Sequence, residues 1–335
     1  MSEPHSGPLL SLRDLTVEFA TRDGTVPVLD RLSIDLDAGA TLGLVGESGC
    51  GKSMTALAIM GLVPSPPGRF AGGSILFADE DLTRASDAHL RDIRGNSISM
   101  IFQEPMTSLN PVYTIGEQIA EVLRRHQDLG RRAAWERAVE LLDSVSIPLP
   151  GRRAHDYPHQ LSGGMRQRVM IAIALACRPR ILIADEPTTA LDVTVQAQIF
   201  DLLQALREET GTAIILITHD MGVVAEMTER VVVMYAGRMV EEGPVRDILS
   251  EPHHPYTRGL IASVPHLHAE VSDEPEDLLE IPGIVPSLAE FGQERCLFAP
   301  RCPRVSDRCR SEQPLLRGSG GWHKAACWHP EAGPA

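Results

Sequence analysis

The sequence predicts an α/β fold with a parallel central sheet, a front layer of antiparallel strands and a helical insertion in the middle. Short apolar runs at residues 41–45, 181–184 and 213–218 predict buried strands. Segments with helical periodicity separate these runs, which is typical of strands joined by helical crossovers. After about residue 265 the periodicity fades and Pro, Gly and Cys become frequent, so a small separate extension is expected.

The individual elements follow from the same criteria. Apolar alternation and a turn at Asp23-Gly24 predict a pair of strands near the N-terminus, at 11–19 and 32–36. Further strands are expected at 74–77, 98–102, 231–234 and 238–240. Helices are expected at 52–60, 114–125, 133–145, 163–176 and 193–209. We therefore predict a domain at 1–264, with a helical subdomain inserted at about 104–160, and a Cys-rich extension at 265–335.

Composition limits the possible partners. The chain has 335 residues and is 43% hydrophobic, which suits one large globular domain with a smaller appendage. The formal charge of −14 argues against a nucleic-acid partner, because phosphate backbones bind clustered Lys and Arg. No secretory signal is visible, and the longest apolar run, 169–177, is far shorter than a bilayer span. Any membrane role would therefore require separate membrane subunits.

A glycine-rich segment follows the predicted strand 41–45 and opens a helix. It fits the pattern G-x-x-x-x-G-K-[ST], in which backbone N–H groups turn inward and cradle a polyphosphate. Only two of the 31 basic residues are lysines, so Lys52 is expected to need a compact ammonium that arginine cannot replace. The alternative is an ordinary glycine-rich turn. We assign ATP binding to Gly46, Glu47, Ser48, Gly49, Cys50, Gly51, Lys52, Ser53 and Met54.

Two adjacent carboxylates end the apolar strand 181–184. Asp185 is expected to bind Mg²⁺ through its water shell, and Glu186 to face the γ-phosphate and polarise the attacking water. Because side chains alternate along a strand, neighbouring carboxylates can take different roles. Taken alone, such a pair is more often a solvated strand terminus.

Further motifs place the chain in a family. The segment Leu-Ser-Gly-Gly-Met at 161–165 resembles the signature loop of ATP-binding cassette (ABC) proteins. Gln103 resembles that family's Q-loop, Ala190-Leu191-Asp192 its D-loop, and His219 its switch histidine. Phe19 stands where the family stacks an aromatic ring on adenine, although an isolated Phe is more often a core residue. The resemblance covers residues 10 to about 250 and implies the ABC-type nucleotide-binding fold.

The resemblance also implies roles for these residues. Catalysis is expected from Glu186, His219 and Gln103, and Mg²⁺ binding from Ser53, Gln103 and Asp185. A second ABC ATPase subunit is expected to pair head-to-tail with this one. Its signature loop would then close over the bound nucleotide. The residues that make this contact in trans are Ser162, Gly163, Gly164 and Asp192. Met165 departs from the usual glutamine, which suits an asymmetric heterodimer.

Within the family, four stretches resemble the oligopeptide/dipeptide importers, a group that includes nickel importers. They lie at 103–111, 162–198, 254–260 and 281–283. This implies ATP-powered peptide import at the cytoplasmic face of the membrane, with two transmembrane permease subunits and an extracytoplasmic solute-binding protein. Docking on the permeases is expected at 103–118, with Met106 and Leu109 facing them.

Other functions remain open at this point. The ATPase could serve an importer of nickel or another small solute, or an exporter. A DNA-repair or chromosome ATPase is disfavoured by the acidic charge and by the short stretch between Lys52 and Ser162. A protein that binds ATP without turnover is disfavoured because Glu186 and His219 are both present.

Four cysteines lie in the extension, at Cys296, Cys302, Cys309 and Cys327. Disulfides are disfavoured in a cytosolic protein. Zinc is an alternative, with His323 and His329 as substitute ligands, but no C-x2-C pair occurs. The wide spacing and the importer resemblance favour a structural 4Fe–4S cluster that would fix a segment too small for its own core.

Overall fold

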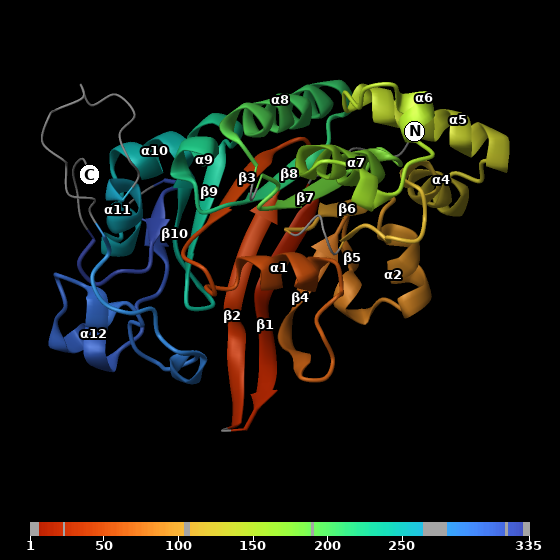
Figure 1. The fold of residues 1–335 in the computed structure, drawn as a ribbon. Helices are drawn as coiled ribbons and strands as arrows, with labels where there is room; N and C mark the ends of the chain where they lie inside the picture. Colours follow the sequence, from red (N-terminus) through yellow and green to blue (C-terminus); the bar gives the residue numbers. More distant parts are fainter. Residues whose placement is uncertain are drawn as a thin grey trace, which may run out of the picture. The chain divides into compact units, whose positions relative to one another are not determined.

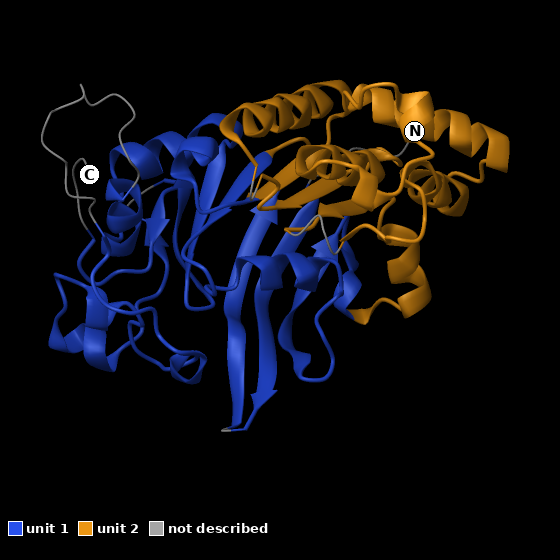
Figure 2. Ribbon diagram, in the orientation of Figure 1, with its two compact units in different colours: residues 1–36, 41–83, 217–335 blue, residues 37–40, 84–216 orange. Residues whose placement is uncertain are grey.

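The computed structural model describes residues 7–22, 24–103, 108–188, 191–263, 280–318 and 321–330. The chain divides into two compact units (Figure 2). Unit 1 comprises residues 1–36, 41–83 and 217–335, and unit 2 comprises residues 37–40 and 84–216. The predicted domain boundary near residue 265 falls among residues 264–279, outside the described residues, and stays a prediction.

Unit 1 contains an antiparallel sheet and the strand that leads to the phosphate loop (Figure 1). The antiparallel sheet has the order β2-β1-β4-β5, and the second group of strands has the order β11-β12-β10-β9-β3. The strands of unit 1 are β1 (Leu10–Thr21), β2 (Gly24–Leu36), β3 (Thr41–Val45), β4 (Gly68–Phe77), β5 (Glu80–Asp81), β9 (Arg230–Tyr235), β10 (Arg238–Pro244), β11 (Arg317–Gly318) and β12 (Lys324–Ala325). Its helices are α1 (Lys52–Ile59), α9 (Met221–Met227), α10 (Val245–Ser250), α11 (Pro255–Ala262) and α12 (Asp307–Ser311).

Unit 2 contains buried strands and most of the helices. Its strands follow the order β8-β7-β6, and β6 pairs with β7 in parallel. They are β6 (Ile98–Ile101), β7 (Ile181–Asp185) and β8 (Ala213–Ile217). The helices are α2 (Asp87–Ile93), α4 (Ile115–His126), α5 (Arg131–Ser144), α6 (Pro150–Arg153), α7 (Gly163–Leu175) and α8 (Val193–Thr210). These elements confirm the predicted α/β class with mixed sheets. Among the described residues, no helix is both long and apolar enough to span a bilayer.

The N-terminal hairpin is longer than the sequence predicted. The second strand was expected at 32–36, whereas β2 begins at Gly24 and pairs with β1 over its whole length. The first half of β2 opens on exposed Gly24 and Thr25 and contains Pro27, a residue that is rare inside strands, so the buried Val28 and Leu29 did not reveal a strand. Its backbone is satisfied by pairing with β1 rather than by burial.

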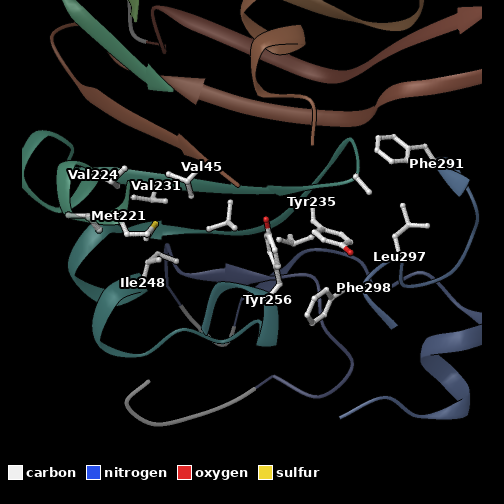
Figure 3. Close-up of a cluster of buried hydrophobic side chains, with 14 residues drawn as sticks. Val45, Met221, Val224, Val231, Tyr235, Ile248, Tyr256, Phe291, Leu297 and Phe298 are labelled. Atoms are coloured by element: carbon white, nitrogen blue, oxygen red, sulfur yellow. The ribbon is translucent and has the colours of Figure 1, made fainter. Parts of the chain in front are cut away.

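The C-terminal segment packs on unit 1 instead of forming its own core. Phe291, Leu297 and Phe298 join a buried cluster that also contains Tyr235 and Tyr256 (Figure 3). In addition, β12 pairs with β10, where Ala325 lies opposite Glu241. Apolar burial and strand pairing therefore attach this segment to the unit that carries the phosphate loop.

Candidate functional site: a phosphate loop and its partner motifs

The glycine-rich loop runs from the end of β3 to the start of α1. Gly46, Gly49 and Gly51 have φ values of +148°, +79° and +108°, which L-residues with side chains rarely adopt. At Gly46 a Cβ atom would lie 2.3 Å from the carbonyl oxygen of Met234, so only glycine fits. This backbone turns the loop back toward the N-terminus of α1, where free N–H groups favour an anion.

Lys52 points into this loop. Its side chain is buried, and Nζ donates to the carbonyl oxygens of Gly46 at 2.6 Å and Glu47 at 3.1 Å. Ser48, Gly49 and Ser53 are exposed, while Met54 is half-buried. The loop therefore combines a buried ammonium with an open side lined by small residues.

Cys50 lies in the phosphate loop with its thiol buried. A helix N-terminus can lower the pKa of a thiol, but here burial has the larger effect. Burial raises the pKa of the Cys50 thiol, and the nearby Lys52 ammonium offsets this only in part. The side chain is thus a neutral packing group, and the backbone of Cys50 is what the loop uses.

Two other predicted residues belong to unit 1. Phe19 is half-buried, and its ring packs so closely on Gly68 that a Cβ there would lie 2.7 Å from it. His219 is exposed and lies two residues after the end of β8. The next residue, Asp220, caps α9 by accepting from the N–H of Gly222 at 2.8 Å. The switch role of His219 and adenine stacking on Phe19 stay predictions.

In unit 2 the fully buried strand β7 ends with Asp185, and Glu186 follows it. Asp185 is buried, whereas Glu186 lies at φ +45°, in the left-handed region. The Gln103 side-chain amide donates to Glu186 Oε2 at 2.7 Å. The structure therefore brings together two residues to which the sequence assigned catalysis, although they lie far apart along the chain.

The signature segment begins helix α7. Ser162 caps this helix by accepting from the N–H of Met165 at 3.3 Å, and Gly163 is exposed. At Gly164 a Cβ would lie 3.2 Å from Val195 of α8, so a small residue suits this position. Asp192 caps α8 by accepting from the N–H of Val195 at 2.9 Å. Both polar side chains thus lie at exposed helix N-termini.

Sequence reasoning missed Gln167 on the same helix. Its side chain is buried, and its amide donates to the carbonyl oxygen of Pro187, directly after Glu186. The bond ties the signature helix to the segment that follows the carboxylates. Gln167 stands between Arg166 and Arg168, so nothing in the sequence marked it as buried.

The predicted docking residues are only partly described. Met106 lies outside the described residues. Leu109 is 3% exposed and cannot face a partner as expected. Val112 and Tyr113, which follow it, are 71% and 52% exposed. The Gln118 side chain braces this turn by donating to the carbonyl oxygens of Asn110 and Tyr113, both at 3.0 Å.

Comparison with known proteins covers nearly the whole chain. The family described as ABC transporter matches residues 29–189, and the oligopeptide/dipeptide transporter C-terminal region matches residues 240–309. A probable peptide ABC transporter ATP-binding protein of Sinorhizobium fredii is 50% identical over 327 residues, covering 98% of this chain and 96% of the relative. An oligopeptide transport ATP-binding protein of Bacillus subtilis is 51% identical over 308 residues, covering 92% of each chain.

Solved structures agree on the fold. A dimeric bacterial ABC transporter cassette matches with a TM-score of 0.64 and 30% identity, covering 71% of this chain and 99% of that one. A dimeric post-hydrolysis state of the same cassette, bound to ADP and phosphate, matches with a TM-score of 0.64 and 29% identity.

The predicted iron–sulfur cluster is wrong. The four cysteines line one small pocket, but among the described residues no cysteine belongs to a group of three donor atoms within 4.8 Å of one another. Burial raises the pKa of the Cys296 and Cys327 thiols to about 11, which favours neutral thiols over the thiolates that bind metal. The matching families and relatives are described by transport and ATP binding, with no iron–sulfur cofactor. The described cysteines therefore do not form the predicted 4Fe–4S site.

The phosphate loop, the paired carboxylates with Gln103 and the signature helix are the parts from which an ABC ATPase is built. The relatives extend the match through the C-terminal region. This chain belongs to the ABC transporter ATPase family, in the group that carries the oligopeptide/dipeptide transporter C-terminal region.

Proposed function

We propose that this chain hydrolyses ATP to power the import of peptides, as one of two motor subunits of a membrane transporter. The observation that carries the proposal is the match to the oligopeptide/dipeptide transporter C-terminal region in a chain with a complete set of ATPase motifs. Relatives named as oligopeptide and dipeptide transport ATP-binding proteins, 51% and 49% identical, support it.

The residues of the phosphate loop fit a nucleotide. The loop offers the donors that a triphosphate needs: backbone N–H groups turned by positive φ at three glycines, the buried ammonium of Lys52 and the hydroxyl of the exposed Ser53. Mg²⁺, when bound, neutralises charge that develops on the phosphate oxygens. We assign its binding to Ser53, Gln103 and Asp185.

Hydrolysis needs a base or an orienting group for water. Glu186 is our candidate, because its carboxylate is already fixed by the Gln103 amide at 2.7 Å. A carboxylate held in this way loses little conformational freedom when it orients water. Gln103 then positions Glu186, and His219 is assigned to stabilise the γ-phosphate.

The partners follow from the same proposal. Ser162, Gly163, Gly164 and Asp192 would contact the nucleotide of a second ATPase subunit, and the related cassette is a dimer. Two permease subunits and an extracytoplasmic solute-binding protein complete the transporter, with this chain at the cytoplasmic face of the membrane. We further propose that residues 265–335 are an extension attached by packing on unit 1.

The proposal is tested by uptake in cells that lack the native copy of this chain. The wild-type chain should restore uptake of labelled di- to pentapeptides, and the Glu186→Gln variant should not. Labelled nickel is measured in the same cells. Restored nickel uptake without peptide uptake would assign the chain to a metal importer, and loss of labelled solute from preloaded cells would assign it to an exporter.

A further inference from the structure

Glu47 lies in the phosphate loop, and its side chain forms an ion pair with the C-terminal segment. Its carboxylate accepts two hydrogen bonds from the guanidinium of Arg301, at 2.6 Å and 2.9 Å. Arg301 closes the short turn Ala299–Arg301, 254 positions further along the chain. A two-pronged arginine–carboxylate pair of this kind is directional as well as strong.

Arg301 is itself held rigidly. Its side chain is only 4% exposed, and it donates to the carbonyl oxygens of Pro282 at 2.9 Å and Ile281 at 3.2 Å. The guanidinium carbon also lies 5.9 Å from the ring centres of Tyr235 and Phe298, two members of the buried cluster (Figure 3). The partners raise the pKa of Arg301, chiefly through the Glu47 hydrogen bonds, so its charge is permanent.

A second contact fixes the backbone of Glu47. The Glu47 N–H donates to the Tyr256 hydroxyl at 2.7 Å. Tyr256 is fully buried, with its ring centre 4.6 Å from Tyr235 and 5.5 Å from Phe298. The carbonyl oxygen of the same Glu47 accepts from Lys52 Nζ at 3.1 Å. The side chain of Glu47 thus contacts the C-terminal segment, its N–H contacts α11, and its carbonyl oxygen contacts the phosphate-binding lysine.

The charges explain why this matters for a polyphosphate. A carboxylate within a loop that receives a triphosphate repels it, and the effect is large where the dielectric is low. The Arg301 guanidinium neutralises that carboxylate and is too firmly hydrogen-bonded to leave it. A buried arginine without its partner would be costly in turn, so each residue keeps the other in place.

We propose that Arg301 is a positioning residue for nucleotide binding, which neutralises Glu47 and holds the phosphate loop and Lys52 in binding geometry from the C-terminal segment. The inference rests on the proposed function, because it concerns the ATP that this loop is proposed to bind. It gives the extension a direct part in the ATPase site.

The test measures ATP affinity of the full-length chain by titration with a fluorescent ATP analogue. Arg301→Gln should raise the dissociation constant roughly tenfold, as expected for an unpaired carboxylate beside the phosphates. Turnover at saturating ATP should change by less than about threefold. The double variant Arg301→Gln/Glu47→Gln should recover most of the affinity, because the unpaired negative charge is gone. Arg310→Gln, which removes an exposed cation from the same segment, is the control.

Recovery of ATP affinity in the double variant would show that Arg301→Gln acts through the unpaired charge of Glu47 and not through loss of structure. If Arg301→Gln binds ATP like the wild type, or if the double variant is as weak as Arg301→Gln alone, the inference is wrong. If Arg301→Gln does not fold, Arg301→Lys replaces it in the test. Lysine keeps the charge but loses the paired hydrogen bonds to Glu47, so the dissociation constant for ATP should rise about threefold to tenfold, and an unchanged constant would overturn the inference. A wild-type chain that binds no ATP would instead overturn the proposed function.

Discussion

Glu186 combines a strained backbone with a fixed carboxylate. A non-glycine residue at φ +45° is uncommon, and such positions recur at functional sites. The backbone geometry directs the side chain away from the line of β7, and Gln103 then receives it. Glu186 is thereby held by Gln103 after the strand ends, whereas Asp185 is buried as the last residue of β7.

This geometry predicts the effect of Glu186→Gln. Hydrolysis should fall by roughly two or more orders of magnitude, because an amide cannot polarise water as a carboxylate does. ATP affinity should remain near wild type, since the phosphate loop is untouched. Steady-state ATP hydrolysis and nucleotide titration check this, with the exposed Glu208→Gln as control. Hydrolysis near the wild-type rate in Glu186→Gln would remove Glu186 from the chemistry.

Lys52→Arg tests the phosphate loop. The lysine side chain is 6% exposed, and its ammonium fits between two carbonyl oxygens of the loop. A guanidinium keeps the charge but is planar and wider, so it should displace the loop. We expect ATP affinity or turnover to fall at least tenfold. A fully active Lys52→Arg protein would show that the lysine does not contact the phosphates.

Lys52 and Glu186 could be predicted from the sequence because each belongs to a short motif whose residues lie next to one another along the chain. The sequence could not reveal Arg301, because its partner Glu47 lies 254 positions away and no periodicity links them. The raised pKa of the Cys50 thiol likewise depends on burial, which its neighbours in sequence do not reveal.

At the scale of elements, the start of helix α11 contains a buried histidine. His254 Nδ1 accepts from the backbone N–H of Tyr256 at 3.1 Å, and the backbone N–H of His254 donates to the Glu241 carboxylate at 2.9 Å. Burial lowers the pKa of His254 to about 4, and the negative charge of Glu241 only partly counters this. The imidazole is therefore neutral in the folded chain well below pH 6.5.

The neutral imidazole of His254 makes the chain less stable in acid. Between pH 6.5 and 4 the unfolded chain binds a proton at His254 that the folded chain does not, so the free energy of unfolding decreases as the pH is lowered. The loss from pH 7 to pH 5 should be roughly 2 kcal/mol. His254→Asn keeps a side-chain acceptor for Tyr256 and takes up no proton, so it should lose most of this dependence. Urea unfolding at both pH values checks this, with exposed His159→Asn as control; equal slopes for wild type and His254→Asn would contradict it.

The turn that precedes α4 gives a second prediction at this scale. Gln118 fixes the backbone of the turn, and Val112 and Tyr113 present apolar surface on it. If this turn contacts a permease, Tyr113→Asp should lower peptide uptake several-fold, with basal ATP hydrolysis unchanged. Leu149→Asp, at a residue 66% exposed elsewhere in unit 2, is the matched control. Equal uptake by the two variants would exclude the turn as the docking surface.

Strong periodicity made the long helices predictable: α4 and α5 begin within two residues of their expected starts. The two-residue strands β11 and β12 carry no such signal. They exist because β10 offers an edge for β12 to pair with, which only the folded chain reveals.

At the scale of the whole molecule, the predicted extension proved to be part of unit 1. A segment poor in periodic apolar residues was expected to need a metal, yet Phe291, Leu297 and Phe298 anchor it in the core. Few aromatic residues suffice when they enter a cluster that already exists. The order of the motifs and the family could thus be predicted from the sequence. How the C-terminal segment is attached to the rest of unit 1 could be seen only in the structure.

We propose that ATP hydrolysis by this chain drives peptide import. This is tested most directly by measuring peptide accumulation in proteoliposomes. The proteoliposomes contain the permeases, this chain and its partner ATPase, and the solute-binding protein is added. Labelled peptide should accumulate against its gradient only when hydrolysable ATP is on the side of the ATPases. Accumulation should vanish with a non-hydrolysable analogue or with Glu186→Gln. Uptake of equal size under those two conditions, or ATP hydrolysis without any peptide movement, would contradict the claim.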